Sequence, residues 1–228
     1  MALLDLRPLD SRRKRALAKT PEGALRDYLS VPLPAPSTRL ADLPLLAVDL
    51  ETTGLDAPTG AILSIGFVPV DGDAITLAGA RRIMIRTGAE VGDSATIHGI
   101  TDDVAEQEGV SLAAGLAELL QALRGRALLA HYAPMETGFL ERACREVFGR
   151  PLVLTAVDTM QVQYRLLATH ASQEPPRSAL RLWAARARYG LPVYKAHDAL
   201  TDALACAELY LALAQEPGVG TTLRDLQR

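Results

Sequence analysis

Hydrophobic residues along the chain fall into short continuous runs and longer segments with helical spacing. Residues 45–48 form a run of four apolar side chains, which is typical of a strand buried on both faces. Residues 62–70 and 74–86 flank an Asp-Gly-Asp turn at 71–73 and predict a β-hairpin. We therefore expect three strands in succession, in a globular domain that begins near Leu40.

The pattern changes after the hairpin to an alternation of helices and strands. Two further buried strands are expected, over residues 127–130 and 152–157. Helices are expected over residues 112–123, from about residue 134, and over 160–168, 178–189 and 198–215. Three strands followed by alternating helices and strands indicate an α/β fold, with a mixed sheet and helices on both of its faces.

The N-terminal segment has a different pattern from the rest of the chain. Residues 10–30 predict a surface helix with scattered apolar side chains. The Pro-rich stretch at 31–37 cannot continue a helix and suits an extended linker. We therefore divide the chain into a helical extension with its linker, residues 1–39, and a globular domain, residues 40–228.

Composition indicates a cytoplasmic protein with a large core. The chain has 228 residues and 49% hydrophobic content, enough for one domain with an extension. No apolar run reaches the ~20 residues of a membrane span, and Asp5 and Arg7 near the start argue against a secretory signal. The two cysteines, Cys144 and Cys206, lie on the apolar sides of expected helices, where core packing explains them. A reducing compartment follows, with no membrane partner.

Charge is distributed unevenly along the chain. The net charge of −3 argues against a broad face that binds nucleic-acid phosphates. Residues 159–196 nevertheless contain one acidic residue, Glu174, and six basic residues: Arg165, Arg177, Arg181, Arg186, Arg188 and Lys195. A second basic run consists of Arg12, Arg13, Lys14, Arg15 and Lys19. Each run fits either a solvated helix face or a phosphate contact, and the sequence does not separate these two interpretations.

Four acidic side chains lie at positions that favour convergence. Asp49 and Glu51 are two residues apart at the end of a strand and therefore project from one face. That pair alone is a weak signal, because strand ends often carry acids. Asp202 and Glu136, however, lie on the apolar sides of their expected helices, where a carboxylate is costly unless it is paired or binds a cation. The four acids predict hard divalent metal ions, and His197 is a natural base for a water proton.

Three motifs resemble those of the DEDDh (DnaQ-like) exonucleases. This family contains the proofreading epsilon subunit of bacterial replicative polymerase, RNase T and oligoribonuclease. Asp-Leu-Glu-Thr-Thr-Gly at 49–54 resembles the first motif, and His-Asp-Ala-Leu-Thr-Asp at 197–202 resembles the third. Residues 131–140 stand where the second motif belongs, and residues 97–101 resemble a segment of epsilon-like members. Order and spacing agree over about residues 43–214.

The second motif departs from the usual family pattern. Glu136 replaces the usual Asp, Tyr132 replaces Asn, and Met135 replaces Phe. Glu keeps the negative charge but adds a methylene group, which could shift a metal ion that it binds. The resemblance implies a ribonuclease H-like fold with a five-stranded mixed sheet, in agreement with the hydrophobic pattern.

The resemblance also implies roles for individual residues. Asp49 would bridge two Mg²⁺ or Mn²⁺ ions, Glu51 and Asp202 would hold the first ion, and Glu136 would support the second. His197 would be the general base, and the catalytic set is Asp49, Glu51, Glu136, His197 and Asp202. The implied substrate-binding residues are Thr52, Thr53, Leu55 and His98. The products would be nucleoside 5′-monophosphates.

Three functional hypotheses follow for this site. A 3′→5′ exonuclease on single-stranded or mismatched DNA ends is favoured, with a polymerase or another replication or repair protein as a candidate partner. An RNA-trimming enzyme similar to RNase T or oligoribonuclease could use the same site, and activity on DNA, RNA and dinucleotides would separate the two. A non-catalytic module that docks on a polymerase or binds nucleic-acid ends would have lost a motif acid or the histidine. All are present.

Overall fold

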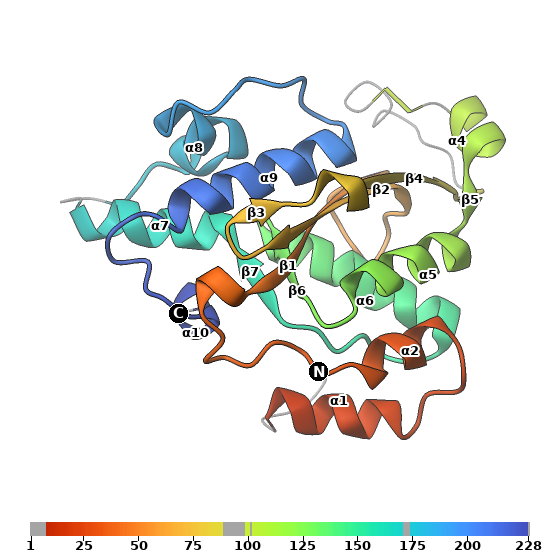
Figure 1. The fold of residues 1–228 in the computed structure, drawn as a ribbon. Coiled ribbons are helices and arrows are strands. Elements are labelled where there is room, and N and C mark those ends of the chain that lie inside the picture. Colours follow the sequence, from red (N-terminus) through yellow and green to blue (C-terminus); the bar gives the residue numbers. More distant parts are fainter. Residues whose placement is uncertain (1–7, 89–98, 101, 171–173, 228) are drawn as a thin grey trace.

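The structure is a computed structural model of the chain, and it describes residues 8–88, 99–100, 102–170 and 174–227. One mixed sheet forms its centre (Figure 1). The strands are β1 (Pro44–Thr52), β2 (Ile62–Asp71), β3 (Ala74–Ile75), β4 (Arg81–Arg86), β5 (Val110–Ser111), β6 (Ala127–Ala130) and β7 (Ala156–Asp158). Their order is β5-β4-β2-β1-β6-β7, and β3 pairs with β2. The α/β class with a mixed sheet is confirmed.

The sheet has seven strands where five were expected, because two-residue strands extend it. The segment 74–86 does not form one long strand. A 3₁₀ turn, η2 (Leu77–Gly79), separates β3 from β4, so β2 pairs with β3 near its end and with β4 near its start. β1 is antiparallel to β2 and parallel to β6, which is parallel to β7.

The strand expected over residues 152–157 is much shorter than predicted. Only Ala156–Asp158 pairs with β6. Leu152 and Val153 are buried without strand pairing, and the Val153 carbonyl accepts a hydrogen bond from the Tyr28 hydroxyl at 3.0 Å. A continuous apolar run indicates burial but does not by itself specify a strand, which explains the error.

Helices cover both faces of the sheet, as expected (Figure 1). Their bounds are α1 (Leu9–Leu17), α2 (Ala24–Ser30), α4 (Asp102–Glu108), α5 (Leu112–Leu123), α6 (Ala133–Phe148), α7 (Thr159–His170), α8 (Leu182–Arg188), α9 (Ala199–Leu213) and α10 (Leu223–Leu226). The segment 178–189 is split into a 3₁₀ turn, η4 (Arg177–Leu180), and α8. No helix in the described ranges combines the length and apolar character of a membrane span.

Alternation along β1 separates the two cores. Leu46, Val48 and Leu50 pack on the face covered by α2, α5 and α6. Leu45 and Ala47 pack on the opposite face, with α7, α9 and α10. Because side chains alternate in a strand, residues 49 and 51 continue the row that faces α9. Both cysteines are buried and free, as predicted for core residues.

The N-terminal extension forms two helices, not one. The chain turns at residues 18–23, where Gly23 has φ +134°, before α2 begins. Leu25, Tyr28 and Leu29 are buried in the core beside α5, so α2 is not the surface helix expected. Helical spacing predicts an apolar side but not which surface covers it. The division at residue 39 stays a prediction.

Candidate active site

The end of β1 brings two acids to the edge of the sheet. Asp49 lies opposite Gly66 of β2, and Glu51 lies opposite Ser64. The register shifts between Glu51 and Thr52, where the paired part of β1 ends. Asp49 is partly buried, and the Glu51 side chain is only slightly exposed. Both acids therefore stand at the carboxyl end of the central strand, beneath α9.

The start of α9 lies directly on β2, and this contact positions Asp202. Asp198 caps the helix, and its Oδ1 accepts a hydrogen bond from the Thr201 N–H at 3.0 Å. A Cβ atom at Gly66 would overlap the backbone of Ala199, the first residue of α9. Glycine at 66 therefore permits the close approach of helix and strand. Asp202, in the first helical turn, is directed toward the acids of β1.

Three carboxylates converge at this point. One oxygen each of Asp49, Glu51 and Asp202 lies within 4.8 Å of the others. Oδ1 of Asp202 is buried and has no hydrogen-bond partner, while its Oδ2 accepts from the backbone N–H of His197 at 3.0 Å. Like charges this close repel one another strongly in a buried site. A cation among these oxygens would offset the repulsion, and hard divalent cations match such oxygen ligands.

Burial and mutual repulsion raise the pKa values of these acids. Burial is the larger cause for Asp49, whose pKa lies well above the ordinary range, and Glu136 is the first of the charges that add to it. Burial, followed by Asp202, raises the pKa of Glu51 to about 7. Burial also raises the pKa of Asp202, although the hydrogen bond from His197 opposes this. Without cations, burial and repulsion thus favour the protonated forms of these acids.

Glu136 stands beside the three-acid cluster, in the first turn of α6. Its side chain is 3% exposed and its Oε2 has no hydrogen-bond partner. Burial, with a smaller contribution from Asp158, raises its pKa to about 8. Glu136 is not among the acids that approach within 4.8 Å, but its charge acts on Asp49. It is the fourth predicted acid, and it belongs to the same site.

His197 lies on the loop that enters α9 and has an unusual backbone conformation. Its φ of +66° falls in the left-handed region, which non-glycine residues rarely adopt. Tyr132, before α6, has φ +79°, so both helices that carry site acids follow a left-handed residue. The His197 side chain is exposed. Its backbone contact with Asp202 places the imidazole next to the acids.

The predicted substrate-binding residues fall into three groups. Thr52 is buried and donates a hydrogen bond to the Gly54 carbonyl at 2.7 Å, and the Thr53 hydroxyl accepts from the Ala61 N–H at 2.9 Å. These hydroxyls hold the loop after β1. Leu55 is 87% exposed on that loop. His98 lies outside the described residues.

Two further acids near the site were not singled out from the sequence. Asp198 forms an ion pair with Arg82 of β4 at 3.2 Å and raises the pKa of Glu51 through its charge. Oδ1 of Asp158 accepts from the backbone N–H groups of Tyr132 and Met160, each at 2.9 Å. An Asp before a helical segment is a capping signal, which predicts the capping role of both residues. Asp198 lies within the third motif, but nothing in the sequence predicts its ion pair with Arg82.

His131, the first residue of the second motif, has a structural role. Its Nδ1 lies 2.8 Å from the Thr159 hydroxyl, and its Nε2 lies 2.7 Å from the Leu180 carbonyl. Burial lowers the pKa of this imidazole, which favours the neutral form. The ring therefore links β6, α7 and η4 behind the acids.

Several basic side chains that were candidates for phosphate contact form ion pairs or hydrogen bonds within the protein instead. Arg13 is buried and pairs with Asp10 at 2.8 Å. Arg165 donates to two backbone carbonyls of α10. Arg186 is buried and pairs with Glu208 at 2.7 Å. Lys14 is exposed but pairs with Asp10 at 2.9 Å. Other exposed basic side chains are Arg15, Lys19, Arg177, Arg181, Arg188 and Lys195.

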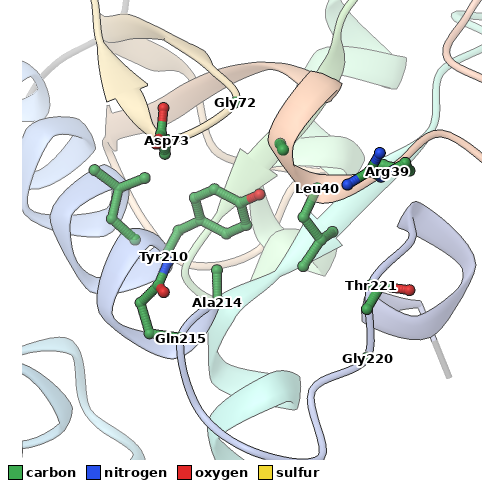
Figure 2. A pocket seen from close by; sticks show the side chains of 11 residues that line it. Arg39, Leu40, Gly72, Asp73, Tyr210, Ala214, Gln215, Gly220 and Thr221 are labelled. Carbon is green, nitrogen blue, oxygen red and sulfur yellow. The ribbon is translucent and has the colours of Figure 1, made fainter.

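A pocket of about 260 Å³ lies elsewhere on the molecule, near the other end of α9 (Figure 2). Figure 2 shows Leu40 and Tyr210 among its lining residues. None of the acids of the cluster lines it. The candidate site is therefore defined by its converging carboxylates and not by this pocket.

Comparison with known proteins identifies the family. The family model RNase_T, described as Exonuclease, matches residues 46–210, which is more than half of the chain. The chain therefore belongs to this exonuclease family, and the expected DnaQ-like 3′→5′ exonuclease class is confirmed. The match contains both acids of β1, Glu136, His197 and Asp202.

Two curated relatives are DNA polymerase III proteins. DNA polymerase III subunit epsilon of Treponema pallidum is 29% identical over 195 residues, which are 79% of this chain and 87% of that protein. DNA polymerase III PolC-type of Thermotoga maritima is 27% identical over 175 residues, which are 76% of this chain but only 12% of that protein. The chain thus spans a small part of the PolC-type relative and most of the epsilon relative.

Solved structures share the fold. A structure of exonuclease I has a TM-score of 0.68 at 15% identity, over 77% of this chain and 42% of that one. E. coli exonuclease I in complex with a dT13 oligonucleotide has a TM-score of 0.65 at 16% identity, over 76% and 41%. The chain spans about two fifths of these proteins, and the likeness confirms the ribonuclease H-like fold class.

Proposed function

We propose that this protein hydrolyses nucleic acid from the 3′ end by a two-metal mechanism, with single-stranded or mismatched DNA ends as the favoured substrate. The observation that carries the proposal is the convergence of Asp49, Glu51 and Asp202, with oxygens within 4.8 Å of one another. The products would be nucleoside 5′-monophosphates. Each part of the proposal has its own support and its own test.

The ligand set supports divalent metal ions. Oδ1 of Asp202 and Oε2 of Glu136 are buried oxygens without hydrogen-bond partners, and a cation would satisfy both. Arg82, the nearby cation of β4, pairs with Asp198 instead. Asp49, Glu51 and Asp202 would hold one Mg²⁺ or Mn²⁺, and Asp49 with Glu136 would hold the second. Bound there, such ions lower the pKa of water and stabilise the charge of the leaving oxygen.

His197 is the proposed general base. An imidazole takes up a proton near neutral pH, and this one is exposed beside the acids, where an attacking water would stand. Its backbone hydrogen bond to Asp202 fixes its distance from a proposed metal ligand. The proton would pass from water to the ring, and then to solvent.

DNA is the proposed substrate class. Both curated relatives described above are DNA polymerase III proteins, and an E. coli structure with the same fold contains a dT13 oligonucleotide. Leu55 and Tyr132 are exposed apolar side chains on the loops that follow β1 and β6, and both could pack against terminal bases. A polymerase or another replication or repair protein is the proposed partner.

One assay tests the proposal. Purified protein with Mg²⁺ or Mn²⁺ is incubated with 5′-labelled single-stranded DNA, mismatched duplex, RNA of the same sequence and a dinucleotide. Stepwise shortening of DNA to 5′-monophosphates supports the proposal, while preference for RNA transfers it to the RNA-trimming alternative. Activity in excess EDTA contradicts the two-metal mechanism. Binding of ends without hydrolysis in either metal contradicts catalysis.

A further inference from the structure

Arg186 of α8 is a buried cation with three polar contacts. Its side chain is 1% exposed. It forms an ion pair with Glu208 of α9 at 2.7 Å, and it donates to the carbonyl of Ala205 at 2.7 Å and to that of Pro192 at 2.8 Å. A buried arginine is costly unless it is paired, and of its nitrogens Nη1 and Nη2 make these contacts while Nε has no hydrogen-bond partner. These contacts therefore hold α8, α9 and the segment after α8 in one arrangement.

Two aromatic rings complete the surroundings of Arg186. The guanidinium carbon lies 5.3 Å from the centre of the Trp183 ring and 4.9 Å from that of Tyr194, and the two rings are perpendicular. The Tyr194 hydroxyl donates to Oε1 of Glu208 at 2.8 Å. Tyr194 thus contacts both members of the ion pair, which adds a second attachment of its segment to α9.

The segment that Arg186 holds leads directly to His197. Residues 190–197 lie between α8 and α9. Pro192 and Tyr194 contact the Arg186 side chain, and the Leu191 N–H donates to the Arg186 carbonyl at 3.2 Å. Val193, between them, is 90% exposed, so the segment runs along the surface. Three residues after Tyr194, His197 adopts its left-handed conformation and donates to Asp202. A left-handed non-glycine residue persists only when its surroundings hold it.

We propose that Arg186 is a positioning residue for the active site, because it fixes segment 190–197 on α9 and thereby sets the place of the His197 imidazole. The inference rests on the role of His197 in the proposed function. Ala205 and Glu208, which contact Arg186, lie one and two helical turns after Asp202 on α9, so Arg186 is anchored to the helix that carries this acid. Arg186 does not contact substrate. Its effect on His197 passes through the segment that it holds, and its charge also opposes the rise that burial causes in the pKa of Asp202.

The test compares Arg186→Met with Arg145→Met. The control removes an arginine from another ion pair, that of Arg145 with Glu141 at 2.6 Å, which is exposed on α6. An exposed ion pair of this kind contributes little to the stability of the fold. Hydrogen exchange is measured over residues 190–198, and steady-state cleavage of single-stranded DNA is measured with and without His197→Ala. We expect Arg186→Met to speed exchange of this segment by at least ~10-fold, with other segments unchanged.

Kinetics then separate positioning from general destabilisation. Arg186→Met should lower kcat by roughly 10²-fold with KM changed less than about 3-fold, because a displaced base does not weaken binding. In the His197→Ala background, Arg186→Met should lower kcat by less than about 3-fold, since the imidazole that Arg186 positions is gone. Arg145→Met should match the parent protein in both measurements.

Each result decides the proposal. Unchanged exchange over residues 190–198 overturns it, and so does an equal loss of rate with and without His197. If His197→Ala itself keeps the parent rate, the proposed base has failed, while hydrogen exchange still reports whether Arg186 holds the segment. If Arg186→Met does not fold, Tyr194→Phe removes only the bond to Glu208. It should speed exchange and lower kcat by at least about 3-fold, and parental values for both overturn the proposal.

Discussion

The backbone N–H of His197 donates a hydrogen bond to Oδ2 of Asp202 at 3.0 Å, so the proposed base and a proposed metal ligand are joined through the main chain. The other oxygen of Asp202 is buried and has no partner. One carboxylate thus fixes the base with one oxygen and leaves the second for a cation. The left-handed φ of His197 accompanies this arrangement.

Asp202→Asn separates these two functions of the carboxylate. The amide keeps an oxygen that can accept from His197, but it loses the negative charge beside the proposed cation. We expect the rate of DNA hydrolysis to fall by at least ~10³-fold, with unchanged circular dichroism, because stabilisation of charge in the transition state is lost. Asp71→Asn, which loses a carboxylate paired with Arg126 away from the cluster, is the control and should keep full activity. A parental rate for Asp202→Asn argues against metal binding at this residue.

His197→Ala and His197→Gly test the imidazole and the backbone separately. Both variants lack the ring, but glycine adopts φ +66° without strain. If the ring is the base, both should lose roughly 10²- to 10⁴-fold in kcat, with the loss smaller at high pH, where hydroxide replaces the base. Pre-steady-state cleavage across pH measures this. Full activity of His197→Gly beside an inactive His197→Ala would instead assign His197 a purely conformational role.

The local periodicity of hydrophobic residues was sufficient to predict most of the fold and to single out the four acids. Helical spacing identified Asp202 and Glu136 as buried, and strand alternation put Asp49 and Glu51 on one face. Such predictions need only neighbouring residues, since each concerns one element. The burial of Tyr28 against the core and the break at η2 depend on contacts with distant segments, which no local pattern contains.

Arg186 illustrates the same difference for charge. In the sequence it is one of six basic residues in a run, and nothing distinguishes it from Arg188 two positions later. In the structure Arg186 is buried against Glu208 and two aromatic rings, while Arg188 is exposed. The sequence shows that a residue is charged but not which residue it pairs with in the fold. The distance between acids on β1 and α9 likewise depends on Gly66, whose contact joins two segments far apart in sequence.

Gly66→Ala tests that contact. The added methyl group would meet the backbone of Ala199, which cannot rotate away as a side chain could. We expect a loss of roughly 1–3 kcal/mol in the free energy of unfolding. Displacement of Asp202 should reduce activity by at least ~10²-fold. Gly138→Ala on α6 is the matched control, because its Cβ would meet only a side-chain methyl group at 3.4 Å. Urea unfolding and DNA hydrolysis would contradict the prediction if both variants behaved alike.

The raised pKa values predict an inverse dependence of stability on pH without metal. Burial raises the pKa of Glu51 to about 7 and that of Glu136 to about 8, whereas both titrate near ~4.3 in an unfolded chain. Between these values the folded protein binds more protons than the unfolded one. The stabilisation is therefore complete below about pH 4 and lost as the pH rises through 7 and 8.

Thermal unfolding in EDTA measures this dependence. Because Glu51 and Glu136 lose their protons in this range, we expect the Tm to fall between about pH 5 and pH 8.5. Saturating Mg²⁺ should remove most of this fall, because a bound cation stabilises the ionised acids. Glu51→Gln should reduce the fall by removing one titrating group. A Tm that is independent of pH in both EDTA and Mg²⁺ would show that these acids do not hold protons in the folded state.

Glu136 is where this sequence departs from the family pattern, and its substitution tests whether the departure matters. Its charge acts on Asp49, and its Oε2 is buried without a partner. Glu136→Gln removes that charge but keeps the size of the side chain. If Glu136 holds the second cation, the Mg²⁺ concentration for half-maximal rate should rise by about 10-fold or more, because a neutral amide binds a dication far more weakly.

Glu136→Asp completes the comparison. The shorter side chain keeps the charge and should lie between the parent protein and Glu136→Gln in its Mg²⁺ requirement, if α6 is already placed for the longer ligand. Glu141→Gln, an exposed acid five residues later on α6, is the control and should not change the titration. A Glu136→Gln titration that overlays the parent would mean that Glu136 stays protonated in the working enzyme. The pKa of about 8 makes that alternative measurable, since Glu136 would ionise between pH 7 and pH 9, and the Mg²⁺ titrations of the parent and of Glu136→Gln should then separate at pH 9.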